Sequence, residues 1–319
     1  MKNIINKNYF EVVRPGVNST FQDFGRNIFY HIGIPFSGAM DNRNFLLANT
    51  ISNNSINSPV LEFAYQGPKL KYKGDNLYFN VTGDINFQII RKNKIIKCNC
   101  YENIALKDND YLDILSTNRS VYGYLSIAGQ FKLDYYLDSC SINTKAQIGA
   151  NEGKKLAKDQ IIEIYNIRKN ISQNKIEYLN SKIENIRVLT GPHFDYFSEI
   201  AKKLFFKENF LVTKLSDRMG MRLDGPSIEN IKNTNIKSEG LVKGVIQIPA
   251  DGKPIIMLSD HGTVGGYPKI GVVISADYDK LVQLPPGSKI KFKEINLKDA
   301  ETTFKLYEME TKNLISKAK

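Results

Sequence analysis

Residues 255–275 read IIMLSDHGTVGGYPKIGVVIS, and this stretch is the most informative about the fold. Two compact apolar runs, Ile255–Leu258 and Val272–Ser275, flank the polar, glycine-bearing segment Asp260–Pro268. Short apolar runs bounded by Gly, Pro or Asp are typical of β-strands. The stretch therefore predicts two strands joined by a polar loop that is a candidate functional site.

The same pattern recurs along most of the chain. The segments Phe87–Ile90 and Ile95–Cys98 flank Lys92-Asn93-Lys94, which predicts a hairpin. Lys289–Lys293 alternates lysine with apolar residues, which favours an edge strand with its lysines facing water. Further strands are predicted at Glu11–Val13, Val60–Ala64, Leu77–Val81, Tyr122–Ile127, Ile161–Ile164, Ile186–Leu189 and Val245–Ile248.

Few segments show helical periodicity. Arg43–Ile51 follows Asp41 and Asn42, either of which can act as the N-cap. Phe194–Phe206 has apolar residues at helical spacing, and Leu297–Ile315 reads as an amphipathic terminal helix. Many short strands with few helices predict a mainly β fold built of barrels.

The length of 319 residues predicts two domains. The least patterned segment is 169–185, which is rich in Asn, Lys and Ser. We expect an N-terminal β-barrel domain over 1–180 and a C-terminal one over 181–319. Strands can be exchanged between β-domains near such a junction.

Composition narrows the class of protein. The net charge is +11 and the sequence pI is about 9.3, but the lysines are spread along the chain without a clustered patch, so no nucleic-acid partner is expected.

Three cysteines (Cys98, Cys100 and Cys140) are too few for a disulfide framework. Cys98 and Cys100 share one face of the expected strand but lack the further ligands of a zinc site, so no metal site is predicted. Residues 1–10 are polar, and no apolar stretch approaches membrane-spanning length, so we expect a cytoplasmic protein without a membrane partner.

The loop Asp260–Pro268 carries the first candidate site. Asp260, His261, Thr263 and Tyr267 supply an acid, a titratable base, a hydroxyl and a phenol. The adjacent glycines Gly265-Gly266 let the backbone approach a ligand. The alternative is a glycine-rich hairpin whose polar side chains satisfy their own backbone.

A second cluster holds Arg218 and Arg222, whose planar forks suit a carboxylate or phosphate. The alternative is a turn in which these arginines pair with Asp217 and Asp224. Gln247 lies inside an apolar strand, so its amide either reads a ligand or bonds to neighbouring backbone.

The N-terminal segment offers weaker candidates. Gln22, Asp23 and Arg26 could be site groups, but a glycine-centred turn locked by Asp–Arg pairing is favoured, and His31 is interpreted as structural. The sequence contains no phosphate loop, dinucleotide fingerprint, H-E-x-x-H or G-x-S-x-G motif.

Taken together, a set of motifs in order along the chain resembles the biotin-dependent carboxyltransferase-like family (allophanate hydrolase subunit 2 family). This family includes the C subunit of 5-oxoprolinase, the carboxyltransferase part of urea carboxylase, and the antagonist of the sporulation kinase inhibitor. The matching segments are 14–16, 19–26, 37–41, 48–49, 61–62, 124–129, 218–223, 238–240, 244–249 and 265–268. Departures from the common pattern are Gln130 after Gly129, His261-Gly262 after Asp260, and Met221, the last two of which bear on substrate choice.

The resemblance implies two cyclophilin-like β-barrel domains and an enzyme that acts only with partners. The B-like and A-like proteins of 5-oxoprolinase would join this chain to hydrolyse 5-oxo-L-proline, a cyclic amide, to L-glutamate at the expense of ATP. The complex uses ATP, while binding by this chain itself is left open, since no usual cradle for it is visible. Together with the residue patterns, the resemblance gives catalytic candidates and substrate-binding candidates: Asp260, His261 and Thr263 for catalysis, and Arg218, Arg222, Gln247, Gly265, Gly266 and Tyr267 for binding.

Two other functions remain open. The chain could be the carboxyltransferase component of a biotin-dependent urea or amide carboxylase, in which case the biotin carrier lies elsewhere, because the Ala-Met-Lys-Met attachment motif is absent. It could also be a regulatory protein that sequesters a kinase inhibitor without catalysis.

Overall fold

The structure, a computed structural model, describes residues 6–169, 171, 174–178, 183, 185–232 and 235–317. The chain divides into two compact units. The first comprises Met1–Gly25, Ser37–Asn180 and Lys312–Lys319, and the second comprises Arg26–Phe36 and Ser181–Thr311. The boundary expected between residues 180 and 181 lies outside the described residues, as does part of the expected junction at 169–185.

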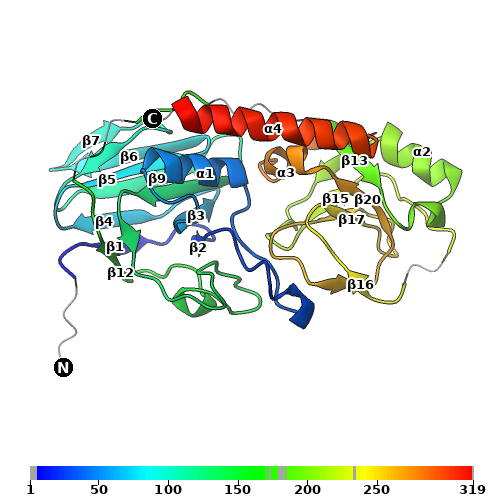
Figure 1. Cartoon of the computed structure of the whole chain (residues 1–319), viewed down its shortest axis with the longest axis horizontal. Coiled ribbons are helices and arrows are strands. Elements are labelled where there is room, and N and C mark those ends of the chain that lie inside the picture. Colours follow the sequence, from blue (N-terminus) through cyan, green and yellow to red (C-terminus); the bar gives the residue numbers. More distant parts are fainter. Residues whose placement is uncertain are drawn as a thin grey trace. The chain divides into compact units, whose positions relative to one another are not determined.

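The first unit contains two antiparallel sheets (Figure 1). The seven-stranded sheet has the order β11-β12-β1-β4-β9-β6-β7, and the five-stranded sheet has the order β2-β3-β10-β5-β8. The strands are β1 (Tyr9–Arg14), β2 (Thr20–Gln22), β3 (Val60–Ala64), β4 (Lys69–Lys73), β5 (Leu77–Thr82), β6 (Ile85–Arg91), β7 (Lys94–Lys97), β8 (Ile104–Leu106), β9 (Tyr111–Thr117), β10 (Tyr122–Ile127), β11 (Gln130–Phe131) and β12 (Ile161–Tyr165).

Side chains from both sheets form the core of this unit. In β4, Leu70 and Tyr72 are buried while the intervening lysines point outward, as the period of two requires. They join one apolar cluster with residues of the five-stranded sheet such as Leu61, Phe79 and Leu125. Burial of this shared face is the main favourable contribution to the unit's stability.

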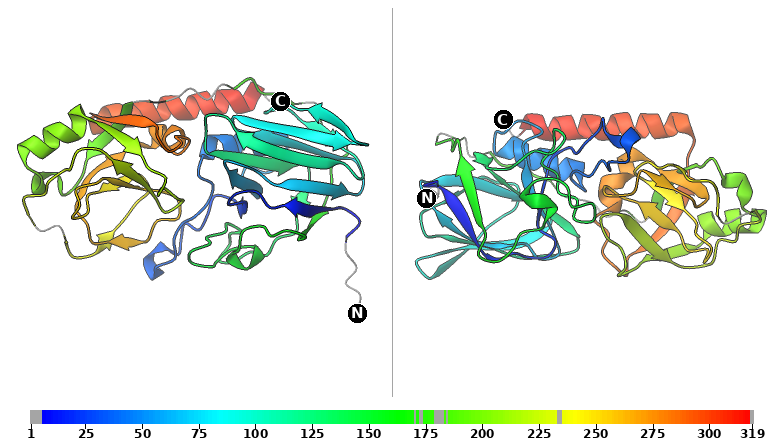
Figure 2. Two further views of the ribbon diagram at one scale, coloured as in Figure 1. Left: turned by 180° about the vertical axis from the view of Figure 1, so that it is seen from behind. Right: turned by 90° about the horizontal axis from the view of Figure 1, so that it is seen from below.

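Helix α1 (Asn42–Ile51) lies against the five-stranded sheet (Figures 1 and 2). Asp41 caps the helix by accepting a hydrogen bond from the backbone N–H of Asn44, which satisfies one of the free donors of the first turn. The predicted helix is therefore confirmed, and of the two expected cap residues, Asp41 and Asn42, it is Asp41 that caps it. The first unit also contains a short 3-10 turn, η2 (Asn151–Gly153), and the last residues of the C-terminal helix.

The second unit is a closed barrel with the order β13-β20-β17-β18-β15-β14-β21. Neighbouring strands are antiparallel except β13 and β21, which are parallel. A separate two-stranded ribbon, β16–β19, accompanies the barrel. The strands are β13 (Asn185–Thr190), β14 (Asn209–Val212), β15 (Gly220–Asp224), β16 (Glu239–Gly240), β17 (Val245–Gln247), β18 (Ile255–Met257), β19 (Val264–Gly265), β20 (Lys269–Val273) and β21 (Lys289–Glu294).

The helices of the second unit are α2 (Glu199–Lys207), α3 (Ser275–Leu281) and most of α4 (Leu297–Lys317), with the short turns η1 (Tyr30–Ile32) and η3 (Phe194–Tyr196). Phe205 of α2 is fully buried and stacks on Phe292 of β21 with ring centroids 4.4 Å apart. None of the helices in the described residues is both long and apolar enough to cross a membrane.

The mainly β fold is confirmed, including the hairpin β6–β7, whose turn residues Lys92 and Asn93 have positive φ. That both units are cyclophilin-like remains a prediction. The predicted edge strand at Lys289–Lys293 is wrong, because β21 pairs with β14 on one side and β13 on the other. Its alternation is confirmed, since Ile290 and Phe292 are buried while Lys289 and Lys293 are exposed.

Three further local predictions need correction. The predicted helix Phe194–Phe206 is a 3-10 turn followed by α2, because Ser198 caps the helix through the N–H of Ala201. The predicted strand to Ser275 ends at Val273, and Ser275 opens α3. Cys98 and Cys100 follow β7 rather than sharing a strand face.

Replacing Phe205 with alanine tests the barrel-to-α2 packing. We expect a loss of about 3–5 kcal/mol in the free energy of unfolding, because a buried aromatic ring leaves a cavity. Urea denaturation of the chain gives the value. Ile200→Ala, on the exposed side of the same helix, is the matched control and should cost less than about 0.5 kcal/mol. Equal losses in the two variants would contradict the packing described here.

Candidate functional site

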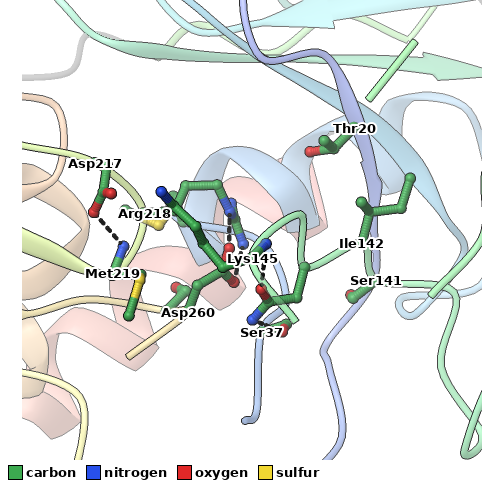
Figure 3. A network of polar contacts seen from close by, with 12 residues as sticks. Thr20, Ser37, Ser141, Ile142, Lys145, Asp217, Arg218, Met219 and Asp260 are labelled. Atoms are coloured by element: carbon green, nitrogen blue, oxygen red, sulfur yellow. Dashed lines mark hydrogen bonds and ion pairs between the residues drawn. The ribbon is translucent and has the colours of Figure 1, made fainter. Parts of the chain in front are cut away.

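The arginine-bearing turn before β15 and the loop after β18 meet at a buried ion pair (Figure 3). Arg218 Nε donates to Asp260 Oδ2 over 2.8 Å, and Nη2 donates to Oδ1 over 2.9 Å. The backbone N–H of Asp260 also donates to Arg218 O over 2.9 Å. The two side chains are 6% and 3% exposed, so this planar, two-pronged contact fixes both loops relative to one another.

This pairing constrains what each of the two residues can do. The inner face of the Arg218 fork is occupied by Asp260, so an external anion would have to approach another edge of the guanidinium. Asp217 accepts the N–H groups of Met219 and Gly220. Asp224 forms an exposed ion pair with Lys253. Arg222 is exposed on β15 and, within the described residues, has no ion pair.

His261 is buried next to Asp260 and is only 1% exposed. Its Nδ1 lies 2.6 Å from the carbonyl oxygen of Gly262. Since a carbonyl oxygen can only accept, Nδ1 carries the proton and Nε2 keeps its lone pair in the neutral ring. Among the described residues, Nε2 has no hydrogen-bond partner. The ring thus presents an unoccupied proton acceptor.

The surroundings of His261 keep it neutral. Burial lowers the pKa of the imidazole, and the positive charge of Lys243 lowers it further, against the opposing effects of the Gly262 bond and Asp260. The rings of Tyr30 and Phe36 contact the imidazole edge-on, with centroids 6.1 Å and 6.5 Å away. A neutral imidazole with a free Nε2 suits the role of general base.

The loop Arg26–Phe36 supplies these two rings. It is closed at its base by the bond from Arg26 N–H to Phe36 O over 2.8 Å. The hydroxyl of Tyr30 lies within hydrogen-bond distance of Leu241 O and of Thr263 O, the latter at 2.8 Å. Leu241 N–H also donates to Thr263 O, so this carbonyl is held from two sides. The loop therefore fastens the end of the β16–β19 ribbon that bears Thr263.

The predicted binding residues around the double glycine lie together. Gln247 is 4% exposed, and its Nε2 donates to Tyr267 O over 3.2 Å. A Cβ on Gly265 would come 2.7 Å from the same Nε2 atom, so a larger residue here would displace the end of the buried Gln247 side chain. The carbonyl of Gly266 accepts from Ile236 N–H, and the ring of Tyr267 is partly exposed. Gln247 thus bonds to neighbouring backbone, one of the two roles expected of it.

The N-terminal candidates have structural partners. The carboxylate of Asp23 accepts hydrogen bonds from the hydroxyls of Ser139 and Ser141 and from the N–H groups of Gly25 and Cys140. Gln22 Nε2 donates to the carbonyl of Ile142. These contacts lock a turn of the first unit. His31 is exposed on η1.

Some notable residues of this region were not singled out from the sequence. Tyr30 and Phe36 reach His261 from more than 220 positions away, so no local pattern connects them to it. Lys269 is buried at the start of β20, directly after the Gly-Gly-Tyr-Pro segment. A lysine that opens an otherwise apolar strand is the signal that could have identified it.

The second unit also contains a hollow of about 840 Å³, which is not lined by the candidate site residues. It lies along β13, the end of β21 and the start of α4, and contains none of the predicted site residues. Arg187, which lines it, is already paired with Asp277. Within the described residues, no group of three or more His, Cys, Asp or Glu side chains gathers as a metal-binding cluster.

With this geometry in hand, comparison with known proteins identifies the family. The sequence profile of the carboxyltransferase domain, subdomain A and B, matches residues 32–294. The chain belongs to this family.

Relatives match over most of the chain. It is 29% identical to the C subunit of 5-oxoprolinase from Escherichia coli over 290 residues, which cover 91% of this chain and 92% of that protein. It is 31% identical to the C subunit of 5-oxoprolinase from Haemophilus influenzae over 283 residues, covering 88% and 90% respectively. The sequence-based assignment to this family is confirmed.

A solved structure extends the likeness to three dimensions. The crystal structure of the Kluyveromyces lactis urea amidolyase matches with a TM-score of 0.87 at 26% identity. The match covers 98% of this chain and 20% of the urea amidolyase, so the chain spans about a fifth of that protein.

Removing one partner of the buried ion pair should be strongly destabilising. We expect Arg218→Met and Asp260→Asn each to lower the free energy of unfolding by about 3–5 kcal/mol, because a buried charge is left without its counter-charge. The double variant should lose less than the sum of the two. Urea denaturation measures all three. Asp224→Asn, in the exposed pair with Lys253, is the control and should leave the free energy of unfolding almost unchanged. Additive single losses would contradict a direct coupling.

The lowered pKa of His261 predicts an acid-sensitive stability. The unfolded histidine binds a proton near its usual pKa of 6.5, whereas the folded one does so at lower pH, so folding is favoured above pH 6.5. This contribution is lost as the pH falls from 6.5 through the folded pKa. Thermal unfolding between about pH 5 and about pH 8 should therefore show a shallower acid decline for His261→Asn. An unchanged slope would show that His261 is not a neutral buried group.

Proposed function

We propose that this chain is the C subunit of an ATP-dependent 5-oxoprolinase, which hydrolyses 5-oxo-L-proline to L-glutamate together with A-like and B-like subunits. The observation that carries the proposal is the end-to-end match, over about nine-tenths of each chain, with two bacterial proteins named as the C subunit of 5-oxoprolinase. The urea amidolyase is matched over a much smaller share of its length.

The chemistry requires activation of a poor electrophile. Transfer of the γ-phosphoryl group of ATP to the lactam oxygen releases ADP and makes the ring carbon open to attack by water. The bond between this carbon and the ring nitrogen then breaks, which opens the ring and leaves the nitrogen as the amino group. A second water hydrolyses the resulting acyl phosphate to glutamate and phosphate. We assign ATP to the complex and leave its binding by this chain open, since the sequence shows no usual phosphate-binding loop.

Within this scheme the proposed catalytic residues are Asp260, His261 and Thr263. His261 is proposed as the base that accepts a proton from the attacking water, supported by its unpartnered Nε2 and by its lowered pKa. Asp260 is proposed to take part in catalysis while it stays paired with Arg218. This ion pair holds the loop that carries His261 in place. Thr263 is proposed to offer its hydroxyl from the same loop.

The proposed substrate-binding residues surround the glycine pair. Gln247, Gly265, Gly266 and Tyr267 are proposed to contact the lactam, and Arg218 and Arg222 to attract its carboxylate or the phosphoryl group. The tight space between Gly265 and the Gln247 side chain supports this proposal, because a group added at Gly265 would move the Gln247 amide.

Reconstitution tests the function directly. The purified chain, mixed with the A-like and B-like subunits from the same source, should release glutamate from 5-oxoproline only when ATP is present. Glutamate is measured by amino-acid analysis and ADP in parallel. A folded, assembled complex that consumes no 5-oxoproline would defeat the assignment.

A second candidate function is carboxyl transfer from carboxybiotin to a urea-like amide. It is favoured by the match of 98% of the chain to the urea amidolyase structure. Incubation with free carboxybiotin and urea distinguishes the two, since only a carboxyltransferase would consume carboxybiotin in a urea-dependent manner.

Substitution of the crowded glycine should impair substrate handling. Gly265→Ala places a methyl group against Gln247 and Leu241, so we expect KM for 5-oxoproline to rise about tenfold and stability to fall by about 1–3 kcal/mol. Gly240→Ala, on the paired strand of the ribbon, has no heavy atom within 4 Å of the added carbon and is the matched control. Equal KM values for the two variants in steady-state kinetics would contradict the proposed contact surface.

A further inference from the structure

A second polar cluster lies at the other end of the β16–β19 ribbon and consists of His193, Glu239 and Lys269. Lys269 Nζ donates to Glu239 Oε2 over 2.8 Å. His193 Nε2 lies 3.6 Å from the same oxygen. Glu239 pairs with Gly265 across the ribbon, so the cluster adjoins the double glycine.

The orientation of His193 is fixed by the backbone of Lys269. The N–H of Lys269 donates to His193 Nδ1 over 3.2 Å, and the N–H of His193 donates to Lys269 O over 3.2 Å. Because Nδ1 accepts, the neutral ring carries its proton on Nε2, directed toward Glu239. The ring of Tyr196 packs edge-on against the imidazole. The imidazole therefore faces the carboxylate from one side at 3.6 Å, while the lysine donates a hydrogen bond to it.

Lys269 is unusual because its charge is buried whereas that of its partner is not. The lysine is 4% exposed, while the side chain of Glu239 is 49% exposed. Burying an ammonium group is costly unless acceptors satisfy it. An ammonium has three N–H donors, and in the described part of the chain Glu239 Oε2 is the acceptor found for them. The remaining donors can bind a further oxygen, and the exposed glutamate can move aside.

The cluster is continuous with the proposed binding surface. Lys269 lies opposite Gln247 across the β17–β20 pairing. The Gln247 amide lies where a side chain on Gly265 would project, and it donates to Tyr267 O. A ligand that contacts the glycine pair is thus flanked by an amide and by a buried cation.

We propose that Lys269 binds the carboxylate of the substrate, with Glu239 holding the ammonium in place until the substrate arrives and His193 positioning Glu239. The ligand class is a small cyclic amide bearing a carboxylate next to its ring nitrogen. This inference rests on the proposed function and names Lys269, rather than Arg218 or Arg222, as the group that recognises the carboxylate of 5-oxoproline. The two arginines are then left to the phosphoryl group. The uncharged end is left to the residues around Gly265 and His261.

The test compares a charged and an uncharged lactam on the reconstituted complex. For Lys269→Met, KM for 5-oxoproline should rise about tenfold to a hundredfold, because a charge-assisted hydrogen bond is lost. The inhibition constant of pyrrolidin-2-one, the same ring without the carboxylate, should stay unchanged. Lys237→Met, an exposed lysine two residues before Glu239, is the matched control and should behave as the unaltered protein. An unchanged KM, or a parallel loss for both lactams, overturns the inference.

A second variant gives a result of opposite sign. Glu239→Gln removes the competing carboxylate at a half-exposed position, so KM for 5-oxoproline should fall several-fold while the chain stays folded. A purely structural ion pair would give no such tightening, and an unchanged or raised KM overturns the inference even if Lys269→Met fails to fold. The outcomes remain separable from those of the proposed function. A complex that turns over 5-oxoproline without these changes sinks only the inference, whereas an inert complex sinks both.

Discussion

The buried ion pair between Arg218 and Asp260 is the contact on which the polar region of the second unit depends. It joins the turn that leads into β15 to the loop that leaves β18, and both of its charges are removed from water. Such a pair contributes little net stability compared with an apolar contact of the same shape, but breaking it is costly. The main effect of the pair is therefore to position the two segments that it joins. It fixes the first residue of the loop that carries His261, Thr263 and the double glycine.

From that fixed point the loop continues as one strand of the β16–β19 ribbon, and the two ends of the ribbon differ in chemistry. At one end, Tyr30 bonds to the backbone and its ring contacts a neutral histidine with a free nitrogen. At the other, a buried lysine is held by a half-exposed glutamate. A proton acceptor and a cation separated by a glycine-rich ribbon fit the proposed opening of an amide that carries a carboxylate.

Much of the fold follows from local pattern, because a strand with one buried face must alternate and a turn must hold residues that accept its backbone angles. That is why the hairpin around Lys92 and Asn93 and the Asp41-capped helix can be predicted correctly. Barrel closure is different. The alternation in Lys289–Lys293 indicates one wet face but not the number of neighbouring strands, so the prediction of an edge strand for β21 is wrong. The helix α3 escapes prediction because its start follows directly on an apolar strand.

The candidate site divides in the same way. Glycines and polar residues in one loop identify a place where a ligand can approach, and the loop and the arginine turn do meet at Asp260 and Arg218. The partners of these residues are not local: Tyr30 lies 211 positions from Leu241, whose carbonyl it contacts. The pairing of Arg218 with Asp260, rather than the alternative pairing with Asp217 or Asp224, also arises only when strands β15 and β18 come together.

A crystal structure of the reconstituted complex with 5-oxoproline bound tests the central claim most directly, namely that the β16–β19 ribbon is where the substrate lies. We expect the ligand's carboxylate within hydrogen-bond distance of Lys269 Nζ and its ring against Gly265 and Gln247. A ligand bound instead in the hollow beside the start of α4, with the ribbon bare, would contradict that claim.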